Sequence, residues 1–363
     1  MKIAFFTETY HPQVNGVVTS IDISKKELER RGHKVYIFAP EPGREEKNVF
    51  RFGSIKFKPY PEYMISVPRN RILKKILEIK PDIIHLHGPF TAAATGLAIG
   101  RLFNIPVVVT YHTHITEYTE YLGKSFKHIK RKIAIKYVKW FHNRADAIIA
   151  PSESIKKELR TYGVRKAIHV ISTGVDLKIR NKKKNVNKTS LILHVGRLCK
   201  EKEVDAVIRS IKKINKGNLI ITSKGPDEER LKSLVRKLGL SKRVKFTGYI
   251  SDKQRDALYK KADVFVSASA SETQGLVILE AMSYGCPVVV RNARGFNDVV
   301  KNNKNGLLFN RESEIPSKIN EIMNSKIRGK IIENGYKTVR EYSIINTTDK
   351  LEALYKRLIN RKI

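Results

Sequence analysis

Short runs of apolar and β-branched residues alternate along this chain with longer segments whose apolar residues recur at helical spacing. In the first half, the predicted strands are 2–6, 34–39, 82–87, 106–111, 145–150 and 167–171. The helical segments between most of them are 16–31, 70–79, 90–103, 124–144 and 152–161. This alternation predicts parallel βαβ units and a doubly wound sheet.

The segment 177–189, LKIRNKKKNVNKT, is polar and basic without periodicity, and we interpret it as a linker. Beyond it the alternation restarts. The strands predicted there are 190–195, 218–222, 243–247, 263–267 and 287–291, and the helices are 201–214, 227–238, 251–261 and 276–284. We therefore predict two similar α/β domains, 1–176 and 190–344, and mostly helical structure from about 312 to 363.

Composition narrows the class of protein. With 363 residues and 41% hydrophobic residues, the chain has enough apolar material for two cores, which excludes disorder as the main state. Two cysteines form no disulfide framework and favour a reducing cytoplasm. The short apolar start MKIAFF does not resemble a secretion signal, and no apolar run is long enough to span a membrane.

The formal net charge of +36 favours an anionic partner, whether a nucleic acid, an anionic membrane surface or a phosphorylated substrate. A basic coat on an ordinary surface is the plain alternative. The chain has no recognition helix and no zinc-finger spacing, so a nucleic-acid-binding protein is only a distant alternative.

Candidate chemistry lies in the turns that follow strands, where doubly wound folds bind their ligands. In the first domain, Gly16 opens the helix after the first strand, which suits a phosphate or an ordinary tight turn. In the second, the stretch HVGRLCKEKE places Arg197 and Lys202 on the corresponding turn. A guanidinium fork and an ammonium together suit a diphosphate.

The segment SETQGLVILEAMSYGCPVV is the most informative one. Gly275 introduces a helix that carries Glu280, eight residues after Glu272. At about 100° per residue, two acids at this spacing fall within about 80° of each other, so both are able to address one ligand. Carboxylates accept hydrogen bonds from sugar hydroxyls, and the N–H groups after Gly275 suit a phosphate. Two unrelated acids are the alternative.

Six stretches together resemble retaining glycosyltransferases of family 4, which have the two-domain GT-B fold of two Rossmann-like domains. They are TETYHPQVNGV, PDIIHLHGPF, VVVTYHTHITEYTEY, HVGRLCKEKE, FTGYIS and SETQGLVILEAMSYGCPVV, in the family's order. The resemblance implies a donor site in the cleft between the domains. It also implies that a final helix, 345–363, returns to the first domain.

The resemblance assigns roles to individual residues. It implies that Gly16, Arg197 and Lys202 hold the donor diphosphate, and that Glu280 accepts from the ribose. It further implies that Glu272 and the backbone at Gly275 and Leu276 contact the donor sugar, that Gln274 belongs to the donor-binding residues, that Tyr249 meets the base, and that His112 lies near the anomeric carbon. Two positions depart from the family pattern: Glu203 stands where Gly or Asn is frequent, and Gln274 replaces a commoner Phe.

The implied reaction transfers a hexose from a nucleotide diphosphate sugar to a hydroxyl with retention at the anomeric carbon. No Asp-x-Asp metal pair occurs in the sequence, so we expect no metal and no other cofactor. A metal-dependent hydrolase is the rival, because His85 with His87 and His112 with His114 form H-x-H pairs near strand ends. No further His and carboxylate set completes such a site, and we expect His85, His87 and His114 to line the crevice.

The segment 124–144 carries eight Lys or Arg and no acid. Phe126, Ile129, Ile133, Tyr137, Trp140 and Phe141 fall within about 120° of a helical wheel. We predict that this apolar stripe packs on the sheet and leaves a basic face able to meet anionic lipid. The membrane-facing candidates are Lys127, Lys130, Arg131, Lys132, Lys136 and Trp140.

The stretches TYHTHITEYTEY and SETQGLV also resemble bacterial diacylglycerol glucosyltransferases. They imply UDP-glucose as donor, diacylglycerol or a glycosyl diacylglycerol as acceptor, and a cytoplasmic enzyme bound peripherally to the membrane. The alternatives are a GDP-mannose-dependent mannosyltransferase acting on a phospholipid and an enzyme with a polysaccharide or other soluble acceptor. The sequence indicates no obligate protein partner.

Overall fold

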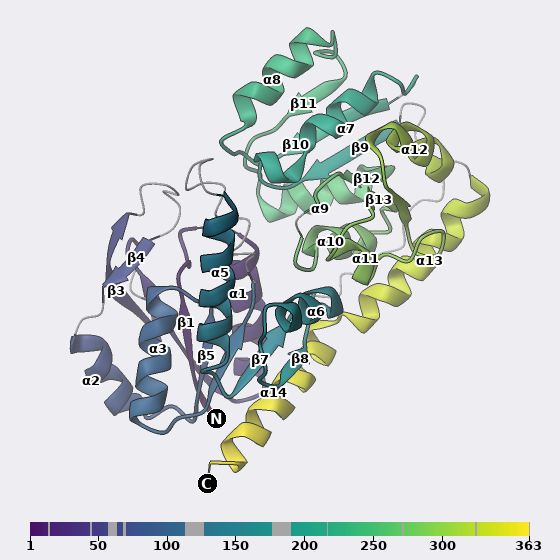
Figure 1. Ribbon diagram of the computed structural model, residues 1–363. Helices are drawn as coiled ribbons and strands as arrows, with labels where there is room; N and C mark the ends of the chain where they lie inside the picture. The colour runs from purple at the N-terminus through teal and green to yellow at the C-terminus, as the bar shows by residue number, and fades with distance from the viewer. Residues whose placement is uncertain are drawn as a thin grey trace. The chain divides into compact units, whose positions relative to one another are not determined.

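The computed structural model describes residues 1–13, 15–43, 46–56, 64–67, 70–112, 127–175, 190–215, 217–270, 272–323 and 325–362. The chain divides into two compact units, drawn in Figure 1. Unit 1 comprises Met1–Gly174 and Ile344–Ile363, and unit 2 comprises Val175–Ser343. The sequence predicted domain bounds of 1–176 with 345–363 and of 190–344. The predicted linker 177–189 lies outside the described residues.

Unit 1 is built on an eight-stranded sheet with the order β4-β3-β2-β1-β5-β6-β7-β8. Neighbouring strands run parallel except β3 and β4, which are antiparallel. The direction of winding reverses between β1 and β5, which makes the ends of these two strands the switch point of the sheet. The strands are β1 (Lys2–Thr7), β2 (Lys34–Pro40), β3 (Val49–Lys56), β4 (Met64–Val67), β5 (Ile83–His87), β6 (Val107–Thr110), β7 (Ala147–Ala150) and β8 (Ile168–Val170).

Helices cover both faces of this sheet, because successive residues of a buried strand point to opposite faces. In β1, Ile3 and Phe5 pack under α1 and α14, whereas Ala4 and Phe6 pack under the helices of the other face. Helix α14 comes from the end of the chain and packs against α1 (Figure 1). The helices are α1 (Gly16–Arg30), α2 (Asn70–Ile79), α3 (Thr91–Leu102), α5 (Lys127–His142), α6 (Glu153–Thr161) and α14 (Ile344–Asn360).

Unit 2 is built on a six-stranded parallel sheet with the order β11-β10-β9-β12-β13-β14, so its switch point lies between β9 and β12. Its strands are β9 (Ser190–Val195), β10 (Gly217–Thr222), β11 (Val244–Phe246), β12 (Val264–Ser267), β13 (Val288–Arg291) and β14 (Leu307–Phe309). Its helices are η2 (Lys200–Lys202), α7 (Val204–Ile211), α8 (Glu228–Lys237), α9 (Asp252–Lys261), α10 (Leu276–Ser283), α11 (Phe296–Val299), η3 (Glu312–Glu314), α12 (Ile315–Met323) and α13 (Ser325–Glu341).

The predicted strands and helices are present, with ends that move by up to a few residues. The main exception is the helix predicted over 201–214, which is broken at Glu203 into η2 and α7. The sequence did not predict β3, β4 and β14. In β3 the reason is Arg51, a charged residue that is 2% exposed because its guanidinium donates to the backbone carbonyls of Pro40 and His11.

The prediction for the apolar stripe of 124–144 is wrong for half of its members. Ile129, Ile133 and Trp140 are 54%, 61% and 47% exposed. Phe141 packs in the core and Tyr137 packs partly buried against it, as predicted. They are joined by Ala134 and Val138, which the predicted stripe did not include, and Phe126 lies outside the described residues. The helical-wheel prediction combined two neighbouring apolar rows of α5 into one stripe. A sequence in which Ile and Lys alternate does not indicate which of these rows faces the sheet. Among the described residues, no helix is long and apolar enough to cross a bilayer.

Candidate functional site

The turn after β9 carries Gly196, Arg197 and Lys202 at the carboxyl edge of the unit 2 sheet. The loop after β10 packs tightly beneath this turn: the N–H of Leu198 donates to the carbonyl of Lys224, and the N–H of Asp227 donates to the carbonyl of Leu198. A Cβ at Gly225 would lie 2.1 Å from the carbonyl oxygen of Leu198. Backbone packing therefore holds the turn in place before any ligand binds.

Lys202 and Glu272 form an ion pair across the switch point, with Nζ 2.5 Å from Oε1. Their side chains are only 22% and 17% exposed. Burial by itself lowers the pKa of the Lys202 ammonium, but the attraction of the Glu272 carboxylate outweighs burial and raises that pKa. The two residues come from the ends of β9 and β12, which are neighbours only in the folded sheet. An anion that binds Lys202 has to compete with Glu272.

Glu203 adopts a left-handed backbone conformation with φ of 46°, at the boundary between η2 and α7. This conformation favours Gly or Asn, which explains why these residues are frequent at this position and why Glu203 is a departure. The Glu203 carboxylate accepts a hydrogen bond from Nη1 of Arg291 at 2.5 Å. That ion pair with β13 offsets part of the backbone strain, so the turn keeps its conformation without glycine.

Helix α10 begins at Leu276, directly after Gly275, which has φ of 76°. A Cβ at Gly275 would lie 2.6 Å from the ring of Phe296, so only glycine fits this position. The N-cap residue Gly275 has no side chain and so makes no side-chain cap bond to the backbone N–H groups at the start of α10. Gln274, the second departure, is 3% exposed directly before this turn. The helix start predicted after Gly275 is therefore present, whereas phosphate binding there stays a prediction.

The helical spacing argument for the two acids is wrong, because Glu272 lies before the first residue of α10. Glu272 pairs with Lys202, whereas Glu280 accepts a hydrogen bond from the Tyr259 hydroxyl at 3.0 Å and lies 3.6 Å from the guanidinium of Arg255. Burial raises the pKa of Glu280, although Arg255 and the Tyr259 hydroxyl act in the opposite direction. Sequence reasoning missed Arg255 and Tyr259, whose four-residue spacing on α9 was the available signal.

Tyr249 follows β11 at the same edge of the sheet and is 69% exposed. An exposed aromatic ring is unusual in this unit and is available for stacking. In unit 2, Arg197, Lys202, Tyr249 and Gly275 lie in the segments that follow strands β9, β11 and β12, whereas Glu280 lies within α10. The fold places Lys202 in direct contact with Glu272 and leaves Glu280 with partners of its own.

In unit 1, Gly16 is the first residue of α1 and is exposed. The Asn15 side chain caps this helix by accepting hydrogen bonds from the N–H groups of Val17 and Val18 at 3.0 Å each. The start of α1 is therefore already partly satisfied, in contrast to the start of α10. A Cβ at Gly16 would meet nothing within 4 Å, so the fold does not require glycine here.

His112, the predicted residue near the anomeric carbon, follows β6 and is hydrogen-bonded to His87 at the end of β5, with His112 Nε2 3.0 Å from His87 Nδ1. Burial lowers the pKa of His112 to about 4, so its imidazole is neutral near pH 7. His85 lies on the same face of β5 and is held between the Tyr355 hydroxyl and Thr110 Oγ1 at 2.5 and 2.6 Å. His114 lies outside the described residues.

Glu8 was not predicted as a site residue from the sequence, although it directly follows the first strand. It is 2% exposed, and its two carboxylate oxygens accept hydrogen bonds from the N–H groups of Ala92 and Ala93 at 3.2 and 3.0 Å. These N–H groups lie in the first turn of α3. Burial raises the pKa of Glu8 to about 7 and outweighs the hydrogen bonds that favour its charge.

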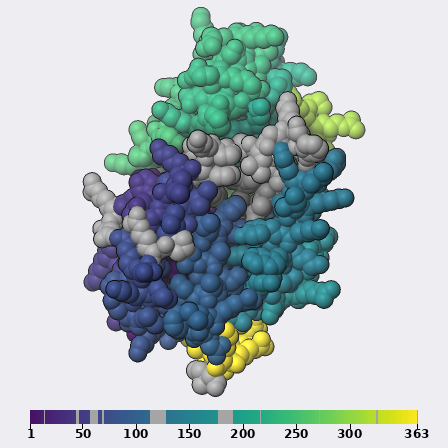
Figure 2. All heavy atoms as spheres, turned by 60° about the vertical axis from the view of Figure 1, so that its left-hand side comes forward, coloured from purple at the N-terminus to yellow at the C-terminus, as the bar shows by residue number. Residues whose placement is uncertain are grey.

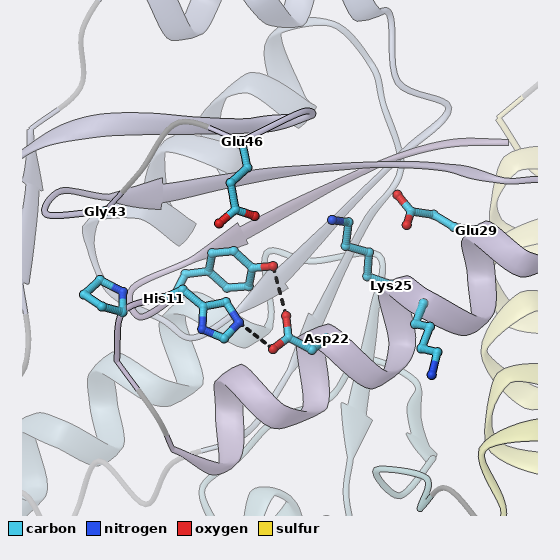
Figure 3. Close-up of a pocket in the computed structure, with 9 residues that line it drawn as sticks. His11, Asp22, Lys25, Glu29, Gly43 and Glu46 are labelled. Atoms are coloured by element: carbon cyan, nitrogen blue, oxygen red, sulfur yellow. Dashed lines mark hydrogen bonds and ion pairs between the residues drawn. The ribbon is translucent and has the colours of Figure 1, made fainter. Parts of the chain in front are cut away.

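A hollow of about 860 Å³ lies between α1 and the loop that follows β2 (Figure 3). Asp22 lies at its centre, where it accepts a hydrogen bond from the Tyr10 hydroxyl at 2.9 Å and pairs with His11 Nε2 at 2.7 Å. The other lining residues are Pro12, Lys25, Lys26, Glu29, Gly43 and Glu46. The sequence predicted none of them. The charged groups drawn here are of both signs, so this hollow has no preference for an anion.

Helix α5 carries basic side chains, and its residues have the blue-green colour of this part of the chain in Figure 2. Lys130, Arg131, Lys132 and Lys136 lie on this helix with Trp140, whereas the side chain of Lys127 lies outside the described part of the chain. Trp140 has the Arg144 guanidinium 4.2 Å above its ring. By helical spacing, Lys132, Lys136 and Trp140 lie beside the exposed Ile129 and Ile133, whereas Arg131 lies about 160° away around the helix.

Within the described ranges, no group of three or more His, Cys, Asp or Glu side chains is arranged to hold a metal ion. In the H-x-H pair that the structure describes, His85 is hydrogen-bonded to the hydroxyls of Tyr355 and Thr110, and His87 is hydrogen-bonded to His112. The rival interpretation as a metal-dependent hydrolase therefore receives no support from these residues.

Comparison with known proteins identifies the family. Residues 14–179 match the family model described as Glycosyltransferase Family 4, and residues 175–338 match the one described as Glycosyl transferases group 1. Over 350 residues the chain is 33% identical to an alpha-monoglucosyldiacylglycerol synthase of Streptococcus pneumoniae, an alignment that covers 89% of this chain and 78% of the relative. The chain belongs to glycosyltransferase family 4, and the predicted resemblance is confirmed.

Solved structures share the fold. A sucrose-phosphate synthase from Thermosynechococcus elongatus superimposes with a TM-score of 0.82 at 20% identity, covering 99% of both chains. HepE from Anabaena, in complex with UDP-glucose, gives a TM-score of 0.76 at 19% identity, covering 98% of this chain and 99% of that one. The predicted GT-B fold of two Rossmann-like units is confirmed.

Glu8 gives a pH-dependent prediction. Because folding raises its pKa from 4.5 to about 7, stability contributed at low pH is lost as the pH rises through this interval. At about 1.4 kcal/mol per unit, the free energy of unfolding of the wild type should fall by about 3 kcal/mol relative to Glu8→Gln between pH 4.5 and 7. Urea unfolding of both proteins across this pH range measures the difference in their free energies of unfolding. The prediction concerns the change of this difference with pH and not its value at pH 4.5. A difference that stays constant with pH would contradict the buried, proton-binding carboxyl.

Proposed function

We propose that this glycosyltransferase moves glucose from UDP-glucose to a hydroxyl of diacylglycerol or a glycosyl diacylglycerol, with retention at the anomeric carbon. The observation that carries the donor assignment is the Lys202–Glu272 pair beside the uncapped start of α10. The names of the relatives support the lipid acceptor, because the Streptococcus pneumoniae protein is a monoglucosyldiacylglycerol synthase. HepE with UDP-glucose supports the nucleotide.

The proposed donor contacts follow from the charges at the edge of the unit 2 sheet. Lys202, Arg197 and the N–H groups of α10 suit a diphosphate, since all of them present positive charge or donors. Glu280 accepts from ribose hydroxyls, Tyr249 stacks on the base, and Glu272 accepts from a sugar hydroxyl once Lys202 has turned to the phosphate. The same proposal assigns Gly16 and His112 of unit 1 to the diphosphate and the sugar.

In the proposed reaction, the bond between the anomeric carbon and the diphosphate oxygen breaks, and a bond to the acceptor oxygen forms on the same face of the sugar. The acceptor proton passes to the departing phosphate oxygen, so no separate general base is needed. Lys202 and the N–H groups at the start of α10 stabilise the charge that grows on this leaving group. This electrostatic role makes a metal unnecessary, and turnover that is unchanged by EDTA is the expected outcome.

The surface of α5 supports a peripheral membrane contact. It combines an exposed apolar stripe, Ile129, Ile133 and Trp140, with lysines and arginines on the same helix. Apolar side chains that remain in water on a basic helix are typical of an interfacial helix. Each Lys or Arg near an anionic surface contributes about 1 kcal/mol, so three or four contacts hold a protein at the bilayer reversibly.

A groove of about 490 Å³ extends this surface between α3 and α5. Leu102 is 71% exposed at its edge, and Arg101 and Arg144 flank it. Its other lining residues are Ala94, Leu97, Ala98 and Trp140. An apolar groove beside two guanidiniums suits the acyl chains and phosphate of an anionic phospholipid.

The donor assignment predicts opposite effects for the two acids. Glu272→Gln removes the competitor for Lys202, so UDP should bind about tenfold more tightly, because one charge-assisted contact is worth about 1.5 kcal/mol. Glu280→Gln removes a ribose contact, so UDP should bind about tenfold more weakly. Isothermal titration with UDP measures both, and turnover of UDP-glucose should fall in both variants. UDP affinities that both equal the wild-type value would overturn the assignment.

Gly16 offers a test that separates ligand binding from folding. Gly16→Ala leaves folding intact because a Cβ there meets nothing within 4 Å, yet it blocks a phosphate that approaches the backbone. We expect turnover to fall by at least about tenfold at an unchanged melting temperature. Gly329→Ala is the matched control, since its Cβ also meets nothing within 4 Å and it lies within α13. Equal turnover in both variants would remove Gly16 from the donor site.

The membrane contact is measurable without a label because Trp140 is the only tryptophan in the sequence. Its fluorescence should shift to the blue with phosphatidylglycerol vesicles, and much less with phosphatidylcholine vesicles or at high salt. Replacing both Ile129 and Ile133 by Ser should weaken binding at least tenfold, at about 1.5 kcal/mol per side chain. Ile345→Ser is the control, because Ile345 is 51% exposed on α14 at the opposite face of the sheet. Binding that ignores lipid charge would remove the membrane hypothesis.

A further inference from the structure

Two histidines of unit 1 hydrogen-bond each other directly. His87 is the last residue of β5, His112 follows β6, and the two strands pair in parallel. His87 Nδ1 lies 3.0 Å from His112 Nε2, and the rings are nearly parallel, with an angle of 16° between their planes. The bond therefore involves one defined nitrogen of each ring, which leaves His87 Nε2 and His112 Nδ1 for other partners.

Both rings are neutral near pH 7. Burial lowers the pKa of His112 to about 4 and that of His87 well below its usual value. A neutral imidazole has one N–H donor and one lone pair that accepts. The hydrogen bond between the two rings thus has a direction, and this direction fixes which nitrogen of His112 carries its proton.

The second nitrogen of His87 indicates the direction. His87 is 4% exposed, and its Nε2 has no hydrogen-bond partner among the residues that the structure describes. A buried N–H without an acceptor is rarer than a buried lone pair without a donor. The proton of His87 therefore belongs on Nδ1, where it is donated to Nε2 of His112. His112 then carries its own proton on Nδ1.

The ring of His87 is held against rotation by its neighbours. Its centroid lies 4.6 Å from that of Phe5 in an edge contact and 4.1 Å from that of His85. His85 is itself fixed at both ring nitrogens, by Tyr355 of α14 and by Thr110 of β6. A flip of the His87 ring would also remove its Nδ1 from His112. The hydrogen bond therefore has one geometry.

We propose that His87 is a positioning residue that holds His112 in the Nδ1–H form, so that His112 presents an N–H donor to an oxygen of the substrate. The inference rests on the proposed function, which places His112 at the donor sugar. It adds that His112 donates a hydrogen bond and does not act as a base, because its Nε2 lone pair is already engaged. A donor at this position selects a hydroxyl oxygen as its acceptor.

The tautomer itself is measured without turnover. Nitrogen-15 NMR of the full chain with labelled histidine distinguishes a protonated from an unprotonated ring nitrogen, and a His112→Gln variant assigns the signals. We expect Nδ1 of His112 to be protonated and Nε2 to be unprotonated at pH 7. A proton on Nε2 would overturn the proposal. This result stands whatever the substrate is, so it separates the tautomer from the proposed function.

Two variants of His87 test the positioning. In His87→Asn the amide takes the place of Nδ1 and is able to donate, so kcat should stay within about threefold of the wild type. In His87→Asp the carboxylate only accepts, which moves the proton of His112 to Nε2 and raises its pKa. We expect kcat to fall at least about tenfold with little change in the KM for the donor sugar, and the pH profile to gain a step.

A purely structural role for His87 predicts a different pattern, in which both variants lose melting temperature and kcat together. Wild-type kcat in His87→Asp with a loss in His87→Asn would reverse the direction of the bond and contradict the proposal. If a variant does not fold, the NMR measurement on the wild type still decides the tautomer.

Discussion

The parallel pairing of strands is the constraint on which the rest of this structure depends. Parallel strands leave all their carboxyl ends at one edge, and the loops with the candidate chemistry follow these ends. In unit 2 the switch point lies between β9 and β12, and there Lys202 meets Glu272. In unit 1 it lies between β1 and β5, and Glu8 and His87 follow or end those strands. Both units thus collect polar groups where the winding reverses.

The buried ionisable groups at these edges differ in the charge state that their surroundings favour. Lys202 keeps its charge through a carboxylate partner, whereas the histidines of unit 1 lose their charge to burial. Glu8 is intermediate, because backbone N–H groups favour its charge and burial opposes it. These differences follow from the partners that each group meets in addition to its burial, which in every case opposes the charged form. They make each group suited to a different task in binding or catalysis.

Helix α5 illustrates the limit of a helical wheel. Its sequence contains two apolar rows separated by lysines, and only the row with Ala134, Val138 and Phe141 enters the core. Ala134 is buried, whereas Ile129 and Ile133 remain exposed. The structure therefore places part of the positive charge of the chain on α5, beside exposed apolar side chains. Composition alone does not predict this position.

The sequence by itself determined the fold class, most of the strands and helices, the family, and the turns at Gly16, Lys202 and Gly275, because these depend on local periodicity and on motifs of adjacent residues. Only the tertiary structure decided that Lys202 pairs with Glu272, that Glu280 pairs with Tyr259, and that His87 bonds His112. The partners in each pair lie between 21 and 70 residues apart and meet only when strands and helices pack. Glu203 combines the two kinds of information. The sequence shows that a Glu stands where Gly or Asn is frequent, and only the fold shows its left-handed backbone and its hydrogen bond from Arg291.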